Sequence, residues 1–229
     1  MADFSALAQW DTPTICNALE VLEPGRRASG FTTKPFTVIA PEAPPIVGHV
    51  RTARIRASSK PASPAEAEAR REAYYAYLED GPRPSVVVIE DLDDEPGFGA
   101  FWGEVNSAIH LGLGCLGCVT NGSFRDVADW AEGFQMLGGM LGPSHGFVHV
   151  VDFGGPVTVH GMEARDGDLI HADRHGAVAF TADLVAGLPE AVAICQVREA
   201  PILEAARAPG FTAQKLQVAR TLSAKVGET

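Results

Sequence analysis

Residues 117–126 read GCVTNGSFRD, and this stretch is the best guide to the architecture of the chain. An apolar run up to Thr120 is typical of a buried strand, and the Asn-Gly that follows is a turn signal. Beyond the turn, Arg125 and Asp126 place a guanidinium beside a carboxylate, at the start of a helix predicted over 127–137. The stretch therefore predicts a strand, a turn and a helix, with two opposite charges at the turn.

The same alternation of strand and helix begins further upstream. A buried strand is predicted at 85–90, a helix at 104–111 and a second strand at 116–120. Strands that alternate with helices are typical of βαβ units, whose neighbouring strands pair in parallel. Before these units, capping signals and apolar periodicity predict helices from Thr12-Pro13 and over 64–78, and strands at 36–40 and 46–57.

Downstream of Gly138-Gly139 the pattern changes to short β segments separated by turn residues. We predict hairpins from the segments 147–153, 156–160, 168–172 and 176–180. Helical patterns return from about 182 and again over 212–226. The chain is therefore predicted to be an α/β protein with a mixed sheet and flanking helices, and no linker divides it.

The composition is that of an ordinary globular protein, with 46% hydrophobic and 21% charged residues in a chain of 229. The formal net charge is −11, which argues against nucleic acid as a partner because affinity for phosphate backbones usually depends on clustered Lys and Arg. No apolar run reaches the roughly 18 residues needed to cross a bilayer, and no secretory signal is visible. We therefore expect a soluble, cytoplasmic protein without a membrane partner.

One arginine and two acidic residues are predicted to meet at one edge of the sheet. Glu104 begins the helix that precedes Arg125 and Asp126, and both positions follow the carboxyl ends of parallel strands, where ligands bind in open α/β sheets. The free N–H groups at 104–106 can hold a carboxylate, and Arg125 offers a planar fork that matches the same group. Asp126 is a hard oxygen ligand suited to Mg²⁺ or Mn²⁺, and Glu104 could add a water-mediated contact.

This pattern predicts a site for a small 2-oxo acid and a divalent cation. The predicted substrate-binding residues are Gly103, Glu104, Val105, Asn106 and Arg125, and the predicted metal ligands are Asp126 and Glu104. A cation and an arginine on one keto acid would stabilise the enolate formed when a carbon–carbon bond breaks. Each residue alone also fits a structural role, with Asp126 as an N-cap, Glu104 offsetting the helix dipole, and Arg125 simply paired with Asp126.

The histidines form a second set of candidates. His145, on a predicted loop, is the best histidine candidate for proton transfer. His145 and His149 would lie roughly 13 Å apart on one face of a regular strand, too far apart to share a metal. His171, Asp173 and His175 alternate near a turn, where polar hairpin residues are favoured over a metal site.

Two motif matches are not interpreted as functional. Residues 112–117 fit the dinucleotide-binding pattern G-x-G-x-x-G, but they follow a helix and enter a strand, which reverses the required order. Cys115 and Cys118 have no second Cys or His pair at zinc-finger spacing. We therefore predict neither nucleotide binding nor a zinc or redox site at these positions.

Three segments together resemble the RraA-like family: Gly103-Glu104, residues 117–126 and residues 167–173, which read GDLIHAD. The family includes the 4-hydroxy-4-methyl-2-oxoglutarate/4-carboxy-4-hydroxy-2-oxoadipate aldolases and the regulator of ribonuclease activity A. The resemblance runs from about Thr12 to Val178. The spacing between Glu104 and Arg125-Asp126 matches the aldolase-type signature of the family, and it is more specific for the family than for the substrate.

The resemblance implies a single β/β/α swivelling-type domain over 1–229, with a helical extension from about 200, assembled as a homotrimer or hexamer. It implies that Asp126 anchors Mg²⁺ or Mn²⁺, that Glu104 supports the water shell of the metal, and that Arg125 binds pyruvate and its enolate. The expected activity is a metal-dependent aldolase or decarboxylase on a 4-hydroxy-2-oxo dicarboxylate or oxaloacetate. His145, or a metal-linked water assisted by a carboxylate, would take the proton of the 4-hydroxyl group.

The resemblance is less complete around the predicted pocket. Asn106, Asn121, the triplet 173–175 and the segment 144–149 differ from the residues more usual in the family. The substrate is therefore open, and two rival functions remain. One is a non-catalytic regulator that binds a ribonuclease or another protein, and the other is a hydrolase or isomerase that uses His145, His149 and His175.

Overall fold

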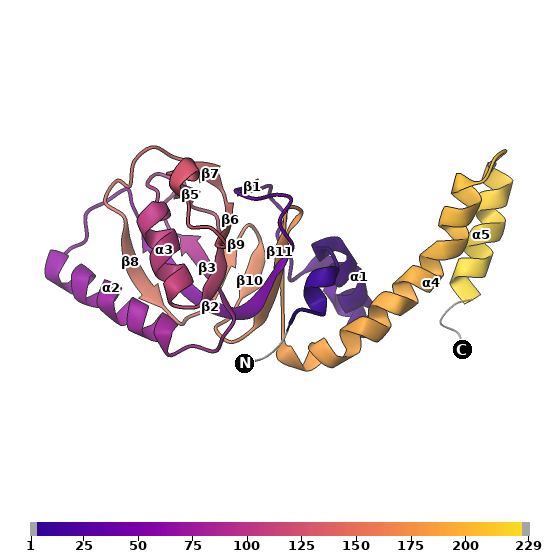
Figure 1. Ribbon diagram of the computed structural model, residues 1–229, viewed down its shortest axis with the longest axis horizontal. Coiled ribbons are helices and arrows are strands. Elements are labelled where there is room, and N and C mark those ends of the chain that lie inside the picture. Colours follow the sequence, from indigo (N-terminus) through magenta and orange to yellow (C-terminus); the bar gives the residue numbers. More distant parts are fainter. Residues whose placement is uncertain (1–3, 226–229) are drawn as a thin grey trace. The chain divides into compact units, whose positions relative to one another are not determined.

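The structure is a computed structural model that describes residues 4–225, with a mixed sheet and flanking helices (Figure 1). Its backbone contacts divide it into two compact units. The first contains residues 29–182 and the N-terminal segment up to Thr12, and the second contains residues 13–28 and the chain from Asp183 onwards. The sheet and all of the predicted site residues lie in the first unit.

Within residues 4–225, eight strands form the main sheet. They are β1 (Thr37–Val38), β2 (Ile46–Arg56), β3 (Ser85–Asp91), β4 (Cys115–Thr120), β6 (Gln135–Gly138), β8 (His149–Phe153), β11 (Leu169–Asp173) and β12 (Gly176–Phe180). Two small pairs lie outside it, β5 (Ser123–Phe124) with β7 (Met140–Leu141), and β9 (Val157–Val159) with β10 (Met162–Ala164). The helices of this unit are α2 (Pro64–Glu79), α3 (Glu104–Gly112) and the 3-10 helices η1 (Leu7–Gln9) and η3 (Val127–Asp129).

The strand order is β1-β6-β4-β3-β2-β11-β12, with β8 also paired to β2. Strands β2, β3, β4 and β6 run parallel to one another, and the remaining pairs are antiparallel. On one side β2 pairs with β3, and on the other its first half pairs with β11 and its second half with β8. A register shift between Arg54 and Ile55 accompanies the pairing with β8. The sheet is therefore parallel in its centre and antiparallel at its edges.

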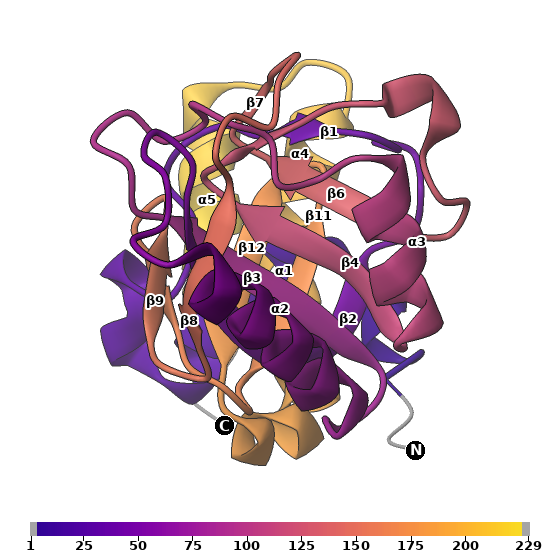
Figure 2. The same cartoon turned by 90° about the vertical axis from the view of Figure 1, so that its left-hand side faces the viewer.

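Hydrophobic cores lie on both faces of this sheet. On one face, side chains of the strands pack with the hairpin β9–β10, including Val157, Val159 and Met162. On the other face they pack with Tyr74 and Leu78 of α2 and with aromatic residues around α3. Figure 2 shows α2 lying across this second face, with α3 beside β4. Because its central strands are buried on both sides, they read as continuous apolar runs in the sequence.

The first predicted βα unit is confirmed, but the helix predicted over 127–137 is wrong. Strand β3, helix α3 and strand β4 occur where the sequence places them. After Asp126 the chain forms only the short helix η3, turns at Gly133 with φ of 91°, and then enters strand β6. All four residues of β6 are buried, and a short apolar run buried on both faces cannot be told from a helix by periodicity alone.

The predicted hairpins are partly confirmed. Strand β11 pairs with β12 across Arg174-His175, as predicted, whereas β9 pairs across His160-Gly161 with β10, a strand that the sequence did not predict. Strand β8 differs, because it pairs with β2 and not with β9. The segment 147–153 therefore extends the main sheet beside β2, and this places the loop before it against the predicted site.

The second unit is helical. It contains most of α1 (Thr12–Leu22), η2 (Pro24–Ala28), η4 (Ala182–Gly187), α4 (Leu188–Arg207) and α5 (Ala213–Lys225). Helices α4 and α5 pack against each other, and α4 contains Pro201. Among residues 4–225, no helix combines the length and the apolar composition that a membrane span requires.

Helix α3 contributes a buried histidine, His110, to the aromatic core. His110 Nδ1 is 2.6 Å from the carbonyl oxygen of Asn106, so it donates there in the neutral ring, and Nε2 accepts from the Tyr74 hydroxyl at 2.9 Å. Both ring nitrogens are thus used without a positive charge. Burial lowers the pKa of His110 to about 4, so that unfolding at moderately acidic pH is coupled to proton uptake.

We expect His110 to make the fold sensitive to acid. Above the ordinary pKa of 6.5 its contribution to stability is complete, and between 6.5 and about 4 the unfolded chain binds the proton more readily. The free energy of unfolding, measured by urea titration, should fall over this window by up to about 3 kcal/mol from this group. In His110→Gln the free energy of unfolding should depend less steeply on pH than in the wild type. Tyr74→Phe should lower the free energy of unfolding but leave its dependence on pH unchanged. Equal slopes in the wild type and His110→Gln would contradict the assignment.

Candidate active site

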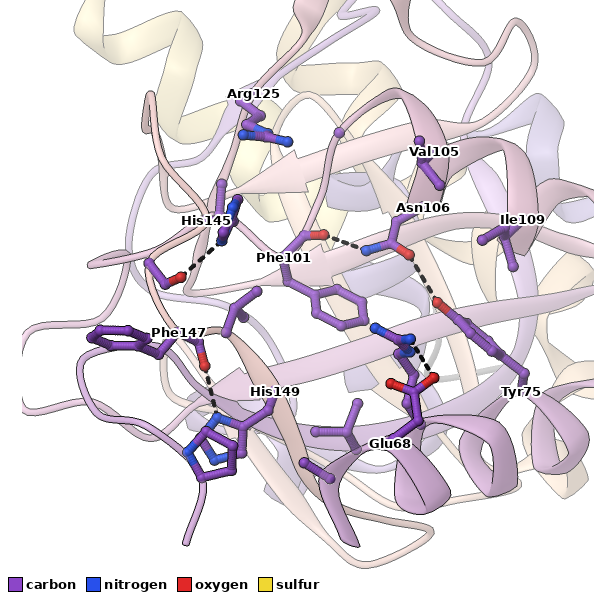
Figure 3. Close-up of a pocket in the computed structure, with 18 of the residues that line it drawn as sticks. Glu68, Tyr75, Phe101, Val105, Asn106, Ile109, Arg125, His145, Phe147 and His149 are labelled. Atoms are coloured by element: carbon purple, nitrogen blue, oxygen red, sulfur yellow. Dashed lines mark hydrogen bonds and ion pairs between the residues drawn. The ribbon is translucent and has the colours of Figure 1, made fainter. Parts of the chain in front are cut away.

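Six of the seven predicted site residues line one pocket of about 680 Å³ in the first unit, and Glu104, which is exposed, is not part of this lining. Gly103, Val105 and Asn106 contribute from the start of α3, and Arg125 and Asp126 from the turn after β5. The loop before β8 contributes His145, and the first turns of α2 form the opposite wall (Figure 3). The pocket therefore combines segments far apart in the sequence.

Asp126 reaches the N-terminus of α3. Its carboxylate oxygen Oδ2 accepts the backbone N–H of Glu104 at 3.4 Å. A Cβ atom built at Gly103 would clash with that carboxylate, so the approach depends on glycine at this position. Asp126 is also in the left-handed region, with φ of 56° and ψ of 41°, and its side chain makes no capping hydrogen bond to η3. The N-cap alternative therefore does not explain this aspartate.

Arg125 lies beside the same carboxylate. Its Nε atom is 3.4 Å from Asp126 Oδ2, and both side chains are somewhat more than a third exposed. The backbone N–H of Arg125 donates to the carbonyl oxygen of Trp102 at 3.0 Å, next to a short parallel bridge between Trp102 and Phe124. This bridge joins the exit of β5 to the entry of α3, and it fixes the guanidinium and the helix N-terminus on one side of the pocket.

Two buried aspartates fold the acidic loop that leads from β3 to Gly103. Asp91 accepts the N–H groups of Asp93 and Gly97, and burial raises the pKa of this carboxyl group. Asp93 accepts the N–H groups of Ala57 and Ser58, both at 2.8 Å. Both carboxylates accept backbone N–H groups of the loop, so we assign them a structural role and no role in the predicted chemistry.

Asn121, one of the residues that departs from the family pattern, ties the exits of β3 and β4 together. Its side-chain oxygen accepts the N–H of Asp91 at 2.8 Å, and its amide nitrogen donates to the Asp91 carbonyl at 3.1 Å. It lines a different hollow from the one that contains Arg125 and Asp126. Its role is therefore in positioning the loop.

His145 and His149 both line the main pocket. His145 Nδ1 is 2.8 Å from the Gly146 carbonyl oxygen, and His149 Nδ1 is 2.8 Å from that of Phe147. In the neutral ring each Nδ1 therefore donates, and each Nε2 has a free lone pair that can accept a proton. The loop is held in place because Ala100 donates its N–H to the Ser144 carbonyl at 2.9 Å.

The other histidines lie elsewhere. His171 is buried, with Nδ1 2.9 Å from the Thr12 hydroxyl, and burial lowers its pKa. His175 binds Asp173 at 3.1 Å in a separate hollow that also contains Trp10. The histidines named in the hydrolase or isomerase alternative thus do not converge, because only His145 and His149 share a pocket.

The donor set around Asp126 is compatible with Mg²⁺ or Mn²⁺. Within residues 4–225, no group of three or more His, Cys, Asp or Glu side chains could hold a metal. Mg²⁺ usually retains several waters and is bound by one or two carboxylates plus substrate oxygens. A single inward carboxylate therefore fits this ion better than it fits zinc. Glu104 is exposed, and its support of a water shell stays a prediction.

Sequence reasoning missed the wall of the pocket that α2 forms. Glu68, Arg71 and Tyr75 line the pocket from one face of this helix. Their spacing of three and four residues indicates a shared helix face. Nothing in that spacing says which other element the face meets, so the wall could not be assigned before the fold was known.

The sheet, with its site at the carboxyl ends of parallel strands, defines a mixed α/β fold shared by several solved structures. An uncharacterized protein from Pseudomonas syringae pv. tomato str. DC3000 is 19% identical, with a TM-score of 0.68 over 96% of this chain and 95% of that chain. RraAS2 from Streptomyces coelicolor, described as an unusual member of the RNase ES inhibitor RraA protein family, is 22% identical, with a TM-score of 0.61 over 85% and 93%. RraA from Thermus thermophilis, described as an RNA-processing inhibitor, is 20% identical, with a TM-score of 0.54 over 72% and 91%.

The family follows from the sequence match. The RraA-like family model, described as Aldolase/RraA, matches residues 12–179, and the chain therefore belongs to this family. No curated protein matches the chain. The structural likenesses show the shared fold, and the family name covers both aldolases and RraA proteins.

The left-handed backbone at Asp126 generates a stability prediction. Because alanine resists this conformation and glycine does not, Asp126→Gly should be more stable than Asp126→Ala by about 1 kcal/mol. Asp129, within η3, provides the control, since there the alanine variant should be the more stable. Urea unfolding of the four variants measures both differences. If the glycine and alanine variants ranked in the same order of stability at both positions, the turn would not hold residue 126 in the left-handed conformation.

Proposed function

We propose that the protein is a divalent-metal-dependent carbon–carbon lyase that acts on a small 2-oxo acid through the enolate of pyruvate. The observation that carries this proposal is the convergence of the Asp126 carboxylate, the Arg125 guanidinium and the N-terminus of α3 in one pocket. Membership of a family described as Aldolase/RraA supports it. Both an aldol cleavage and an oxaloacetate decarboxylation pass through this enolate.

Asp126 would hold Mg²⁺ or Mn²⁺ directly or through water, with Glu104 at the edge of its water shell. When bound, the cation would polarise the keto oxygen of the substrate and stabilise developing negative charge. The left-handed backbone at Asp126 and the hydrogen bond from the Glu104 N–H hold the Asp126 carboxylate in a fixed direction. This fixed direction supports a ligand role, because a ligand that is already oriented loses little conformational entropy on binding.

Arg125 and the first turn of α3 would bind the carboxylate of the 2-oxo acid. The first intrahelical bond runs from the Ser107 N–H to the Gly103 carbonyl, which leaves the N–H groups of Val105 and Asn106 free of intrahelical partners. Such groups at a helix N-terminus bind anions. The Arg125 fork can share the same carboxylate and the negative charge of the enolate.

His145 is the proposed general base. Its Nε2 atom takes the proton of the C4 hydroxyl group, and the C3–C4 bond then breaks with its electron pair remaining on C3. The resulting enolate is protonated at C3 to give pyruvate, and C4 leaves as a carbonyl compound. In decarboxylation of oxaloacetate no hydroxyl proton is removed, so His145 should matter less for that reaction than for aldol cleavage.

We expect oxaloacetate decarboxylation to require Mg²⁺ or Mn²⁺ and to depend on Arg125 and Asp126. Arg125→Ala and Asp126→Asn should each lose on the order of 100-fold in kcat/KM, because each removes a group that stabilises developing charge. Asp129→Asn, three residues away and outside the pocket lining, should retain wild-type activity. Wild-type rates in either of the first two variants would reject the assigned roles.

Calorimetry separates the lyase from a non-catalytic regulator. The lyase should bind Mg²⁺ or Mn²⁺ more tightly when pyruvate is present, since the two ligands share one site. Asp126→Asn should lose metal binding, whereas Arg125→Ala should bind metal but lose the effect of pyruvate. Absence of metal-linked pyruvate binding in the wild-type protein would favour a regulator, the function named for two of the similar structures.

A further inference from the structure

The pocket is larger than a small 2-oxo acid requires. Its volume of about 680 Å³ lies in the range of roughly 300–1,000 Å³ that is typical of sites for much larger ligands. Arg125 and His145 lie towards one end, and Glu68 and Tyr75 of α2 lie towards the other (Figure 3). A second fragment of the substrate can therefore extend from the proposed reaction centre towards α2.

Apolar side chains form much of the wall along this second part, beside the polar residues Glu68, Arg71 and His149. The largest are Phe101 from the loop before α3, Val105 and Ile109 of α3, Phe147 from the loop before β8, and Val150 of β8. Val105 is 69% exposed and Phe147 is 47% exposed. Large apolar side chains that remain exposed inside a pocket gain free energy when an apolar ligand covers them.

Two polar side chains in the same wall, those of Tyr75 and Asn106, are already hydrogen-bonded within the protein. The Tyr75 hydroxyl donates to Asn106 Oδ1 at 3.0 Å, and Asn106 Nδ2 donates to the Phe101 carbonyl at 2.5 Å (Figure 3). Burial raises the pKa of Tyr75, so its hydroxyl keeps the proton that it donates. This chain of hydrogen bonds holds the Tyr75 ring and the Asn106 side chain as a rigid wall beside the ligand.

Both arginines of the lining are paired with a carboxylate. Arg71 lies 2.5 Å from Glu68 on α2, and Arg125 lies 3.4 Å from Asp126. Lys60 lies near the rim, with Nζ 5.4 Å from the centre of the Phe147 ring, and it is outside the lining. At the end near α2 the described lining therefore contains one arginine, Arg71, and the Glu68 carboxylate balances its charge.

We propose, on the basis of the lyase function above, that the space near α2 binds an uncharged, apolar leaving group. The preferred substrates are then 4-hydroxy-2-oxo acids with an alkyl or aryl group on C4. Cleavage breaks the C3–C4 bond and leaves its electron pair on C3, which takes up a proton to give pyruvate. The C4 hydroxyl loses its proton and becomes the carbonyl group of an alkyl or aryl aldehyde, so that no further reactant is needed.

The test compares two substrates that differ only in the group on C4. Pyruvate release is measured with Mg²⁺ from 4-hydroxy-2-oxo-4-phenylbutanoate and from 4-hydroxy-2-oxoglutarate, and oxaloacetate decarboxylation is the reference activity. We expect kcat/KM for the phenyl substrate to exceed that for the dicarboxylate by about 10- to 100-fold, the factor expected for burying one aromatic group. A preference for the dicarboxylate would overturn the proposal.

Variants of the apolar wall make the test specific. Ile109→Asn and Phe147→Ser should lower kcat/KM for the phenyl substrate by about 10-fold and change oxaloacetate decarboxylation little. Ile109→Leu is the matched control and should keep the phenyl activity. Arg71→Gln should leave the phenyl substrate unaffected, and a selective loss with the dicarboxylate would instead assign Arg71 to a second carboxylate and overturn the proposal.

The same assays separate failure of this inference from failure of the lyase function. If oxaloacetate is decarboxylated in a metal-dependent way and the phenyl substrate is not cleaved, the apolar leaving group is wrong and the lyase stands. If oxaloacetate is not decarboxylated and pyruvate is not released from either 4-hydroxy acid, both are wrong. Thermal melting of each variant shows whether it is folded, and Phe147 is exposed enough for its substitution to be tolerated.

Discussion

The approach of the Asp126 carboxylate to the first turn of α3 is the constraint on which the rest of the site depends. It requires glycine at position 103, because any Cβ there would occupy the space of the carboxylate. It also requires residue 126 to adopt a left-handed backbone conformation that most residues avoid. The backbone bond from Arg125 to Trp102 then brings the guanidinium to the same place. Local strain and close packing thus assemble one anionic and one cationic group beside a helix N-terminus.

Much of the central sheet could be predicted from the sequence, because buried parallel strands and amphipathic helices have distinct apolar patterns. The order of β3, α3 and β4 followed directly from these patterns. Strand β6 was mistaken for part of a helix, since a short apolar segment fits both periods. The pairing of β8 with β2 could not be predicted either, because it depends on contacts between segments about a hundred residues apart.

The polar half of the site was easier to anticipate than the apolar half. Arg125 and Asp126 follow a predicted strand end, Gly103 precedes a predicted helix start, and the structure brings them together in one pocket. His145 and His149 both line this pocket, the first from the predicted loop and the second from the first residue of β8. The wall from α2 was missed because a helix face shows its spacing in the sequence and not its neighbour.

The pairing of each arginine in the pocket with a carboxylate has a consequence for the rate of substrate capture. The lining carries little net charge, while the whole chain carries a formal charge of −11. An anionic substrate therefore diffuses towards the protein against a long-range repulsive field and without a positive patch to guide it. Dissolved salt weakens such repulsion, since the Debye length falls to about 8 Å at physiological ionic strength. Association should thus accelerate as salt is added, the opposite of the behaviour of enzymes that attract their substrates electrostatically.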